Sequence, residues 1–117
     1  MGQSRESEDK RGVEMILFQP RFIEPILTGQ KTQTRRKGKK RWNVGAIHQC
    51  KTLLFGEPFA RVKILDVRRE RLGDISFEDA QREGFLSPVG FSATWIDIHG
   101  VFDADEEVWV VEFEALK

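Results

Sequence analysis

The chain has 117 residues, of which 39% are hydrophobic and 32% are charged, and its formal net charge is zero. This length and balance predict one globular domain with a modest core. No apolar run approaches the length of a membrane span, and the first thirty residues lack the apolar segment of a signal peptide. We therefore expect a cytoplasmic protein that does not bind a membrane. A single cysteine, Cys50, excludes an internal disulfide and a cysteine-rich zinc site.

The charge is unevenly distributed along the chain. Seven of the eleven residues from Lys31 to Arg41 are basic and none is acidic. Residues 97–114 contain seven acidic residues and no lysine or arginine. A local excess of positive charge favours an anionic partner, although the two segments could instead neutralise each other in the folded protein.

The first half of the chain predicts a tail, two strands and a short helix. Residues 1–12 are polar and are expected to be a disordered tail, which places the domain at residues 13–117. Residues 14–18 form a short apolar run typical of a buried strand. A helix is expected to begin at Pro20 and to end at Gly29, and Pro25 should keep it short or distorted. Residues 32–36 then predict a second strand.

The second half predicts three more strands and two helices. Residues 37–45 are too charged and glycine-rich for a core segment, and residues 47–55 and 59–67 predict strands joined by a turn at 56–58. Ser76 is a typical N-cap for a helix that runs to Glu83 and ends at Gly84. Apolar spacing over residues 91–98 predicts a further helix, and residues 108–113 a last strand. This order indicates an α+β fold or a small barrel capped by helices.

Three residues have side chains suited to acid–base and nucleophilic chemistry. Lys31 lies in the turn before the strand that carries Thr34, and a lysine that is desolvated in a cleft is a candidate base. A threonine hydroxyl beside such a base is a candidate nucleophile. Glu83 is expected in the last turn of its helix, where a carboxylate is unfavourable. Lysine, threonine and glutamate are also common at such positions in purely structural roles.

The remaining polar and aromatic residues predict no metal or cofactor site. His48 and His99 have no partner at a metal-ligand spacing, and no nucleotide-binding glycine loop is present. Trp42 follows the basic run, where its ring could stack on a nucleic-acid base or pack against the edge of the sheet. The run Arg35 to Arg41 also meets the compositional rule for a nuclear localisation signal.

Four segments resemble the ASCH (activating signal cointegrator homology) domain family. Residues 29–36, GQKTQTRR, resemble the family signature G-x-K-x-x-[E/T]-x-R, and residues 80–85, AQREGF, resemble its A-x-x-E-G-F segment. The helix that contains Trp95 and the closing strand 108–113 complete a resemblance over residues 14–116. It implies a PUA-like fold, which is a small, mostly antiparallel β-barrel capped by short helices.

The resemblance implies a module that binds RNA or a modified nucleoside, and we expect a monomer with a basic cleft and no cofactor. The residues expected to bind the ligand share a position in or next to the signature: Gly29, Arg35, Arg36, Lys37, Lys39, Lys40, Arg41 and Trp42. One bacterial branch hydrolyses N(4)-acetylcytidine, and its lysine, threonine and glutamate match Lys31, Thr34 and Glu83. The alternative is therefore a small amidohydrolase, and another branch implies a ribonuclease. Thr34 stands where many members have glutamate, and a loop more basic than in the amidohydrolase branch favours a polyanion.

Overall fold

A computed structural model describes residues 14–117, so the tail expected at residues 1–12 lies outside the described residues. The elements follow in the order β1 (Met15–Leu17), η3 (Pro20–Phe22), α2 (Ile23–Leu27), β2 (Gln33–Arg36), β3 (Ile47–Lys51), β4 (Ala60–Arg71), η4 (Leu72–Asp74), α3 (Phe77–Arg82), α4 (Pro88–His99) and β5 (Glu107–Ala115). None of these helices is long and apolar enough to cross a membrane.

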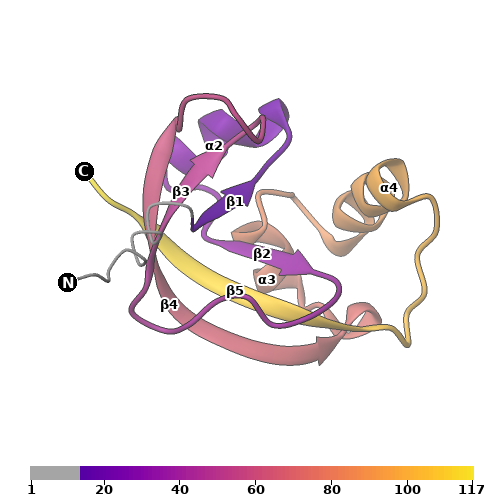
Figure 1. The fold of residues 1–117 in the computed structure, drawn as a ribbon. Coiled ribbons are helices and arrows are strands. Elements are labelled where there is room, and N and C mark those ends of the chain that lie inside the picture. Colours follow the sequence, from indigo (N-terminus) through magenta and orange to yellow (C-terminus); the bar gives the residue numbers. More distant parts are fainter. Residues whose placement is uncertain (1–13) are drawn as a thin grey trace.

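The five strands form one sheet in the order β1-β3-β4-β5-β2 (Figure 1). β1 pairs with β3 in parallel, and the other neighbours are antiparallel. The predicted α+β fold is confirmed, but the sheet is not a closed barrel, because β1 and β2 are its two edges and do not pair. The side chain of Arg36 crosses this opening, where its Nη2 donates to the backbone oxygen of Leu17 at 2.8 Å.

β4 is longer, and β3 shorter, than the sequence predicts. β4 continues to Arg71 after a register shift between Ile64 and Asp66, and its second half lies beside β5. The added residues are mostly charged and show no apolar alternation. Ion pairs with the opposite strand and its loop support them instead, including Arg69 to Glu107 at 3.0 Å. β3 ends at Lys51, and the residues that follow it form an exposed turn.

The helix boundaries depend on local signals that the sequence carries. Ser76 caps α3 as predicted, because its Oγ accepts a hydrogen bond of 3.0 Å from the backbone N–H of Asp79. Gly84 follows α3 with φ 101°, a conformation that glycine adopts without strain. α4 begins with Pro88 in its first turn and ends at Gly100. α2 is a single short turn after η3, as Pro25 predicts.

Two apolar clusters hold the elements together. The first fills the concave side of the sheet around Ile64 and Phe113 and includes Trp42, which is 5% exposed. The second joins α3 and α4 to the end of β4 through Leu72, Ala80 and Trp95, among others. In Figure 1, α3 lies against β2 and β5, whereas α4 stands to one side of the sheet. The cavity that contains the candidate site residues is lined by members of both clusters, including Phe18 and Trp95.

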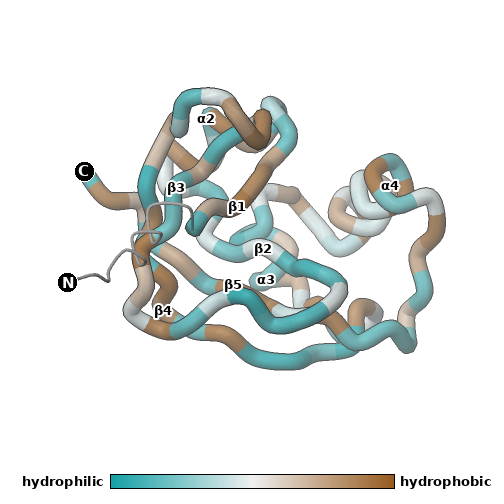
Figure 2. The backbone as a smooth tube through the Cα atoms, viewed as in Figure 1, coloured by the Kyte–Doolittle hydropathy of each residue, from teal (hydrophilic) through white to brown (hydrophobic). Residues whose placement is uncertain are grey.

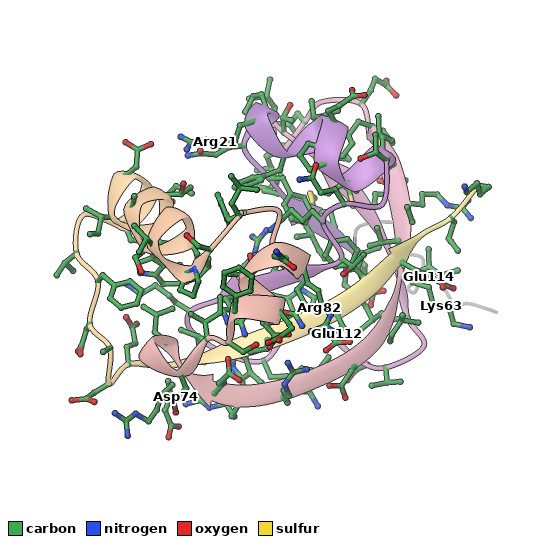
Figure 3. The ribbon with its side chains drawn as sticks, turned by 180° about the vertical axis from the view of Figure 1, so that it is seen from behind. Arg21, Lys63, Asp74, Arg82, Glu112 and Glu114 are labelled. Atoms are coloured by element: carbon green, nitrogen blue, oxygen red, sulfur yellow. The ribbon has the colours of Figure 1, made fainter. Side chains whose placement is uncertain are left out.

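The acidic residues of the last third pair mainly with arginines outside the basic run. Arg21 reaches across to α4 and contacts Asp97 at 2.7 Å (Figure 3). Within the basic run, Lys37 contacts Glu106 at 3.6 Å. Lys39, Lys40 and Arg41 form no ion pair with any residue of the range 14–117. The chain from β2 into the following loop is almost continuously hydrophilic (Figure 2). The two charged segments therefore neutralise each other only at one point.

Candidate functional site

A cavity of about 150 Å³ lies where β2, the β1–η3 segment, the end of α3 and α4 meet. Much of its wall is aromatic, and its polar side chains come mainly from β2 and from the end of α3. The lining residues are Leu17, Phe18, Gln19, Phe22, Lys31, Thr34, Arg35, Arg36, Lys37, Glu83, Phe85, Phe91, Thr94, Trp95, Ile98 and His99. The cavity thus brings together all three residues that the sequence identified as candidates for catalysis.

Lys31 is the most deeply buried cation in this cavity, with 2% of its surface exposed. Its Nζ donates to the carboxylate Oε1 and to the backbone oxygen of Glu83, both at 2.9 Å. The same Nζ lies 4.6 Å from the centre of the Phe22 ring. Burial lowers the pKa of Lys31 below its ordinary value, although Glu83 opposes the shift; the positive charges of Arg36 and Arg35 lower it further. These surroundings favour release of the Lys31 proton.

Glu83 is held between two cations. It is 3% exposed and is the C-cap of α3, where the helix dipole disfavours a negative charge. Oε1 accepts from Lys31, and Oε2 accepts from Nη1 of Arg35 at 3.0 Å. The two charge-assisted bonds offset the unfavourable position and fix the orientation of the carboxylate.

Arg35 links the cavity to a buried network of polar side chains. Its Nη1 also donates to Gln33 at 2.8 Å, and its Nη2 donates to Glu70 at 2.6 Å and to Asp79 at 3.2 Å. Burial acts to lower the pKa of Arg35, but the carboxylates of Glu83 and Glu70 raise it above its ordinary value. Further pairs extend the network to Arg82 and, through Arg68, to Glu112, both labelled in Figure 3.

Thr34 and Arg36 form the opposite side of the polar wall. The Thr34 hydroxyl is buried and accepts a 3.0 Å hydrogen bond from Nε of Arg36, whose guanidinium lies 4.8 Å from the centre of the Phe18 ring. The Thr34 hydroxyl can therefore still give up its own proton. Within residues 14–117, Nζ of Lys31 bonds to Glu83 and has no hydrogen bond to Thr34, so the two groups share the cavity without direct contact.

The residues predicted to bind the ligand separate into two groups. Arg35, Arg36 and Lys37 line the cavity. Gly29 has φ 82° in the turn after α2, and Lys39, Lys40 and Arg41 are exposed; none of these four belongs to the cavity lining. The residues predicted to form a basic cleft therefore lie partly in a small cavity with aromatic and polar walls and partly in the basic loop that follows β2.

Trp42 does not present its ring for base stacking. It is buried in the first apolar cluster, among Ile16, Phe18 and their neighbours. Of the two roles left open by the sequence, packing against the sheet is the one that the structure shows. Trp42 borders a second, larger cavity, described below.

The aromatic wall was not identified as part of the site from the sequence. Phe91 and Trp95 were predicted as the apolar face of a helix, and they do pack on each other with ring centres 5.7 Å apart. The ring of His99 lies against that of Trp95, with centres 4.1 Å apart. The spacing of these three residues, four positions apart, could have indicated one continuous aromatic face. No group of three His, Cys, Asp or Glu side chains within residues 14–117 is arranged to hold a metal ion.

Comparison with known proteins identifies the fold. No protein-family model and no curated protein sequence matches the chain. An ASCH domain from Lactobacillus crispatus JV V101 superposes with a TM-score of 0.74 at 19% identity, covering 97% of this chain and 86% of that one. A protein from Enterococcus faecalis V583 gives 0.66 at 16% identity, with coverages of 96% and 84%. A point mutant of ZmASCH from Zymomonas mobilis gives 0.61 at 17% identity, with coverages of 88% and 71%.

This chain, an α+β domain with an open, mostly antiparallel sheet and short helices, shares its overall fold with these structures. The chain has the fold of an ASCH domain, in agreement with the resemblance seen in its sequence.

Proposed function

We propose that the cavity binds the base of a pyrimidine nucleoside and that the chain is an amidohydrolase acting on an N(4)-acylated cytidine. One observation carries the proposal: a lysine removed from water and fixed by a glutamate shares a small cavity with a threonine hydroxyl. This arrangement supplies a base, a proton relay and a nucleophile.

The size and walls of the cavity favour a single small ring. Pockets for drug-sized ligands measure roughly 300–1,000 Å³, whereas this cavity measures about 150 Å³. Phe22, Phe85 and Phe91 supply flat apolar surfaces, and each of these rings packs edge-on against a neighbour. A planar base fits such walls, and its polar edge would face the side chains of β2 and Glu83.

The reaction can be written with the residues that the cavity brings together. Neutral Lys31 takes the proton of Thr34, and the threonine oxygen attacks the acyl carbonyl carbon. The guanidinium of Arg36, already 3.0 Å from the Thr34 oxygen, stabilises the negative charge that develops on the carbonyl oxygen. The proton passes from Lys31 through Glu83 to the leaving N(4) amine, which releases cytidine. Water then hydrolyses the acyl-threonine and restores the hydroxyl.

This mechanism requires Lys31 and Thr34 to approach each other when substrate binds. Hydrogen bonds between catalytic groups are often long or absent before substrate binds and shorten in the complex. The hydrogen bonds of Lys31 to Glu83 and of Thr34 to Arg36 hold both groups at the cavity wall until then.

The experiment is to incubate the protein with N(4)-acetylcytidine and to measure cytidine and acetate by chromatography. We expect turnover by the wild type and a loss of about 10²–10⁴-fold in Lys31→Met, which removes the base but keeps the side-chain length. Thr34→Val, which replaces the hydroxyl with a methyl group, should be inactive. Lys63→Ala is the control, because Lys63 lies beside Glu114 on β4 and β5, outside the cavity lining (Figure 3). A wild type that forms no cytidine contradicts the proposed activity.

A second candidate function, RNA binding, is supported by the basic loop. Lys39, Lys40 and Arg41 are exposed, have no acidic partner within residues 14–117, and follow Lys37, which lines the cavity. Binding through phosphates should weaken steeply as salt rises. The test is a titration of labelled single-stranded RNA at about 50 and 200 mM salt, the range over which phosphate contacts are lost. Absence of binding at the lower salt concentration contradicts this function.

A further inference from the structure

A second cavity, of about 420 Å³, adjoins the first. Its lining comes from β1 and the residue before it, from Arg36 at the end of β2, from the loop residues Arg41 and Trp42, and from β3 and the turn after it. Its lining residues are Glu14, Met15, Ile16, Leu17, Arg36, Arg41, Trp42, His48 and Leu54. Leu17 and Arg36 belong to the linings of both cavities. The side chain of Arg36, which also donates to the backbone oxygen of Leu17, therefore lies at the boundary of the two spaces.

Arg36 and Arg41 give the second cavity a positive charge. Nε of Arg36 donates a hydrogen bond to the hydroxyl of Thr34, and its Nη2 donates one to the backbone oxygen of Leu17. Its Nη1 forms no hydrogen bond within residues 14–117. Arg41 is exposed and forms no ion pair within the same range. Glu14 contributes the one carboxylate of the lining, so two guanidinium groups face one negative charge. A guanidinium binds the oxygens of a phosphate through two parallel hydrogen bonds.

His48 provides a second, independent indication of a ligand. It is 3% exposed and lines the second cavity, and its Nδ1 has no hydrogen-bond partner within the described part of the chain. Buried polar groups are normally paired, so the buried, unpaired Nδ1 of a residue in the lining is an unsatisfied polar group next to the cavity. Trp42 and Ile16 complete this wall with apolar surface.

The geometry points to a phosphate subsite: we propose that the second cavity binds a phosphate group of a cytidine nucleotide whose base occupies the first cavity. This inference rests on the proposed function and names its substrate class. In a nucleotide the ribose joins the base to the phosphate, and here Leu17 and Arg36 border both cavities, so the ribose of one nucleotide would lie over them. The substrate is then a phosphorylated cytidine, either a free nucleotide or a residue of RNA.

The test compares the binding of cytidine and cytidine 5′-monophosphate by calorimetry. We expect the monophosphate to bind about tenfold more tightly, as one added charge-assisted contact implies. Arg41→Ala should remove most of this preference. Arg61→Ala is the matched control, because Arg61 is an exposed arginine on β4 that lines neither cavity, and it should keep the preference. Raising the salt concentration should reduce the preference of the wild type.

The outcomes separate this inference from the proposed function. If cytidine and its monophosphate bind equally well, the phosphate subsite is wrong and the base-binding cavity stands. A preference that survives in Arg41→Ala also overturns the assignment. If neither compound binds, both proposals fail. Cytidine 3′-monophosphate and a cytidine-containing trinucleotide distinguish the sources: tighter, Arg41-dependent binding of the trinucleotide supports RNA, and tighter binding of a mononucleotide supports the free form.

Discussion

Lys31 and Glu83 are 52 residues apart in the sequence, yet the lysine bonds to both the carboxylate and the backbone oxygen of the glutamate, each at 2.9 Å. One ammonium group therefore pairs with a buried charge and also satisfies a carbonyl at the end of α3. The adjacent backbone makes a similar contact, because the N–H of Thr32 donates to the oxygen of Arg82 at 2.7 Å. The start of β2 thus caps α3, and the cavity forms where the two elements meet.

Glu83→Gln should be strongly destabilising. It removes the negative charge between Lys31 and Arg35 and leaves two buried cations with one fewer counter-charge. Breaking a buried pair from one side costs about 3–5 kcal/mol. The free energy of unfolding, measured by urea denaturation, should fall by an amount of this order. Glu78→Gln, an exposed change on the same helix, should leave it nearly unchanged. Equal small effects of both substitutions would contradict a structural role for the pair.

The activity should rise with pH. Only the neutral amine of Lys31 accepts a proton, and burial lowers the pKa of Lys31 below its ordinary value. The fraction of neutral amine therefore increases as pH rises through this lowered pKa, and kcat/KM should increase with it. The measurement is kcat/KM for N(4)-acetylcytidine as a function of pH. Lys31→Arg keeps a cation that does not deprotonate and should be inactive at every pH. An activity that falls with rising pH would exclude Lys31 as the base.

The features predicted correctly from the sequence depend on neighbouring residues. Ser76 as an N-cap and Gly84 as a helix end act within one turn of chain, so their residue types are sufficient to place them. The assignment of Lys31, Thr34 and Glu83 to one site came from a family resemblance and not from spacing.

The features missed or misplaced depend on distant partners. The sequence did not indicate that carboxylates from β4 and from α3 and its C-cap surround Arg35, which lines the cavity and is also part of a buried network. The second half of β4 shows no apolar alternation that would predict a strand. It is instead supported by ion pairs with distant acidic residues, Arg69 with Glu107 and Arg71 with Asp105. Whether Trp42 stacks on a ligand or packs in the core depends on how its loop folds back onto the sheet, which local sequence does not determine.

Trp42→Ala should act on stability and not through the loss of a stacking contact. Trp42 is buried in the apolar cluster beneath the sheet, and truncation of a buried aromatic residue costs about 3–5 kcal/mol. Urea denaturation should show this loss. Lys40→Ala, two residues earlier and exposed, should change stability by less than about 0.5 kcal/mol. A fully stable Trp42→Ala variant that loses only ligand binding would contradict the packing role.

Cys50 should make the folded protein less stable at high pH. Its side chain is fully buried in β3, and burial raises its pKa to about 12 from an ordinary value of 9.0, although Arg36 opposes the shift. Between these values the unfolded chain loses the thiol proton and the folded chain keeps it. The contribution of this group is therefore constant below pH 9 and declines as pH rises towards 12.

The difference between wild type and Cys50→Ala isolates this effect, because every other titrating group is common to both. The alanine variant has a cavity and a lower stability at pH 7, so the quantity to compare is the change in the free energy of unfolding between pH 7 and pH 10. The wild type should lose about 1.4 kcal/mol more than Cys50→Ala over this interval, because pH 10 is one unit above the ordinary pKa of the thiol in the unfolded chain. Equal losses would mean that the thiol ionises as easily in the folded protein as in the unfolded chain. Rapid alkylation of the native protein by iodoacetamide at pH 10 would likewise show that the buried thiol ionises and would contradict the prediction.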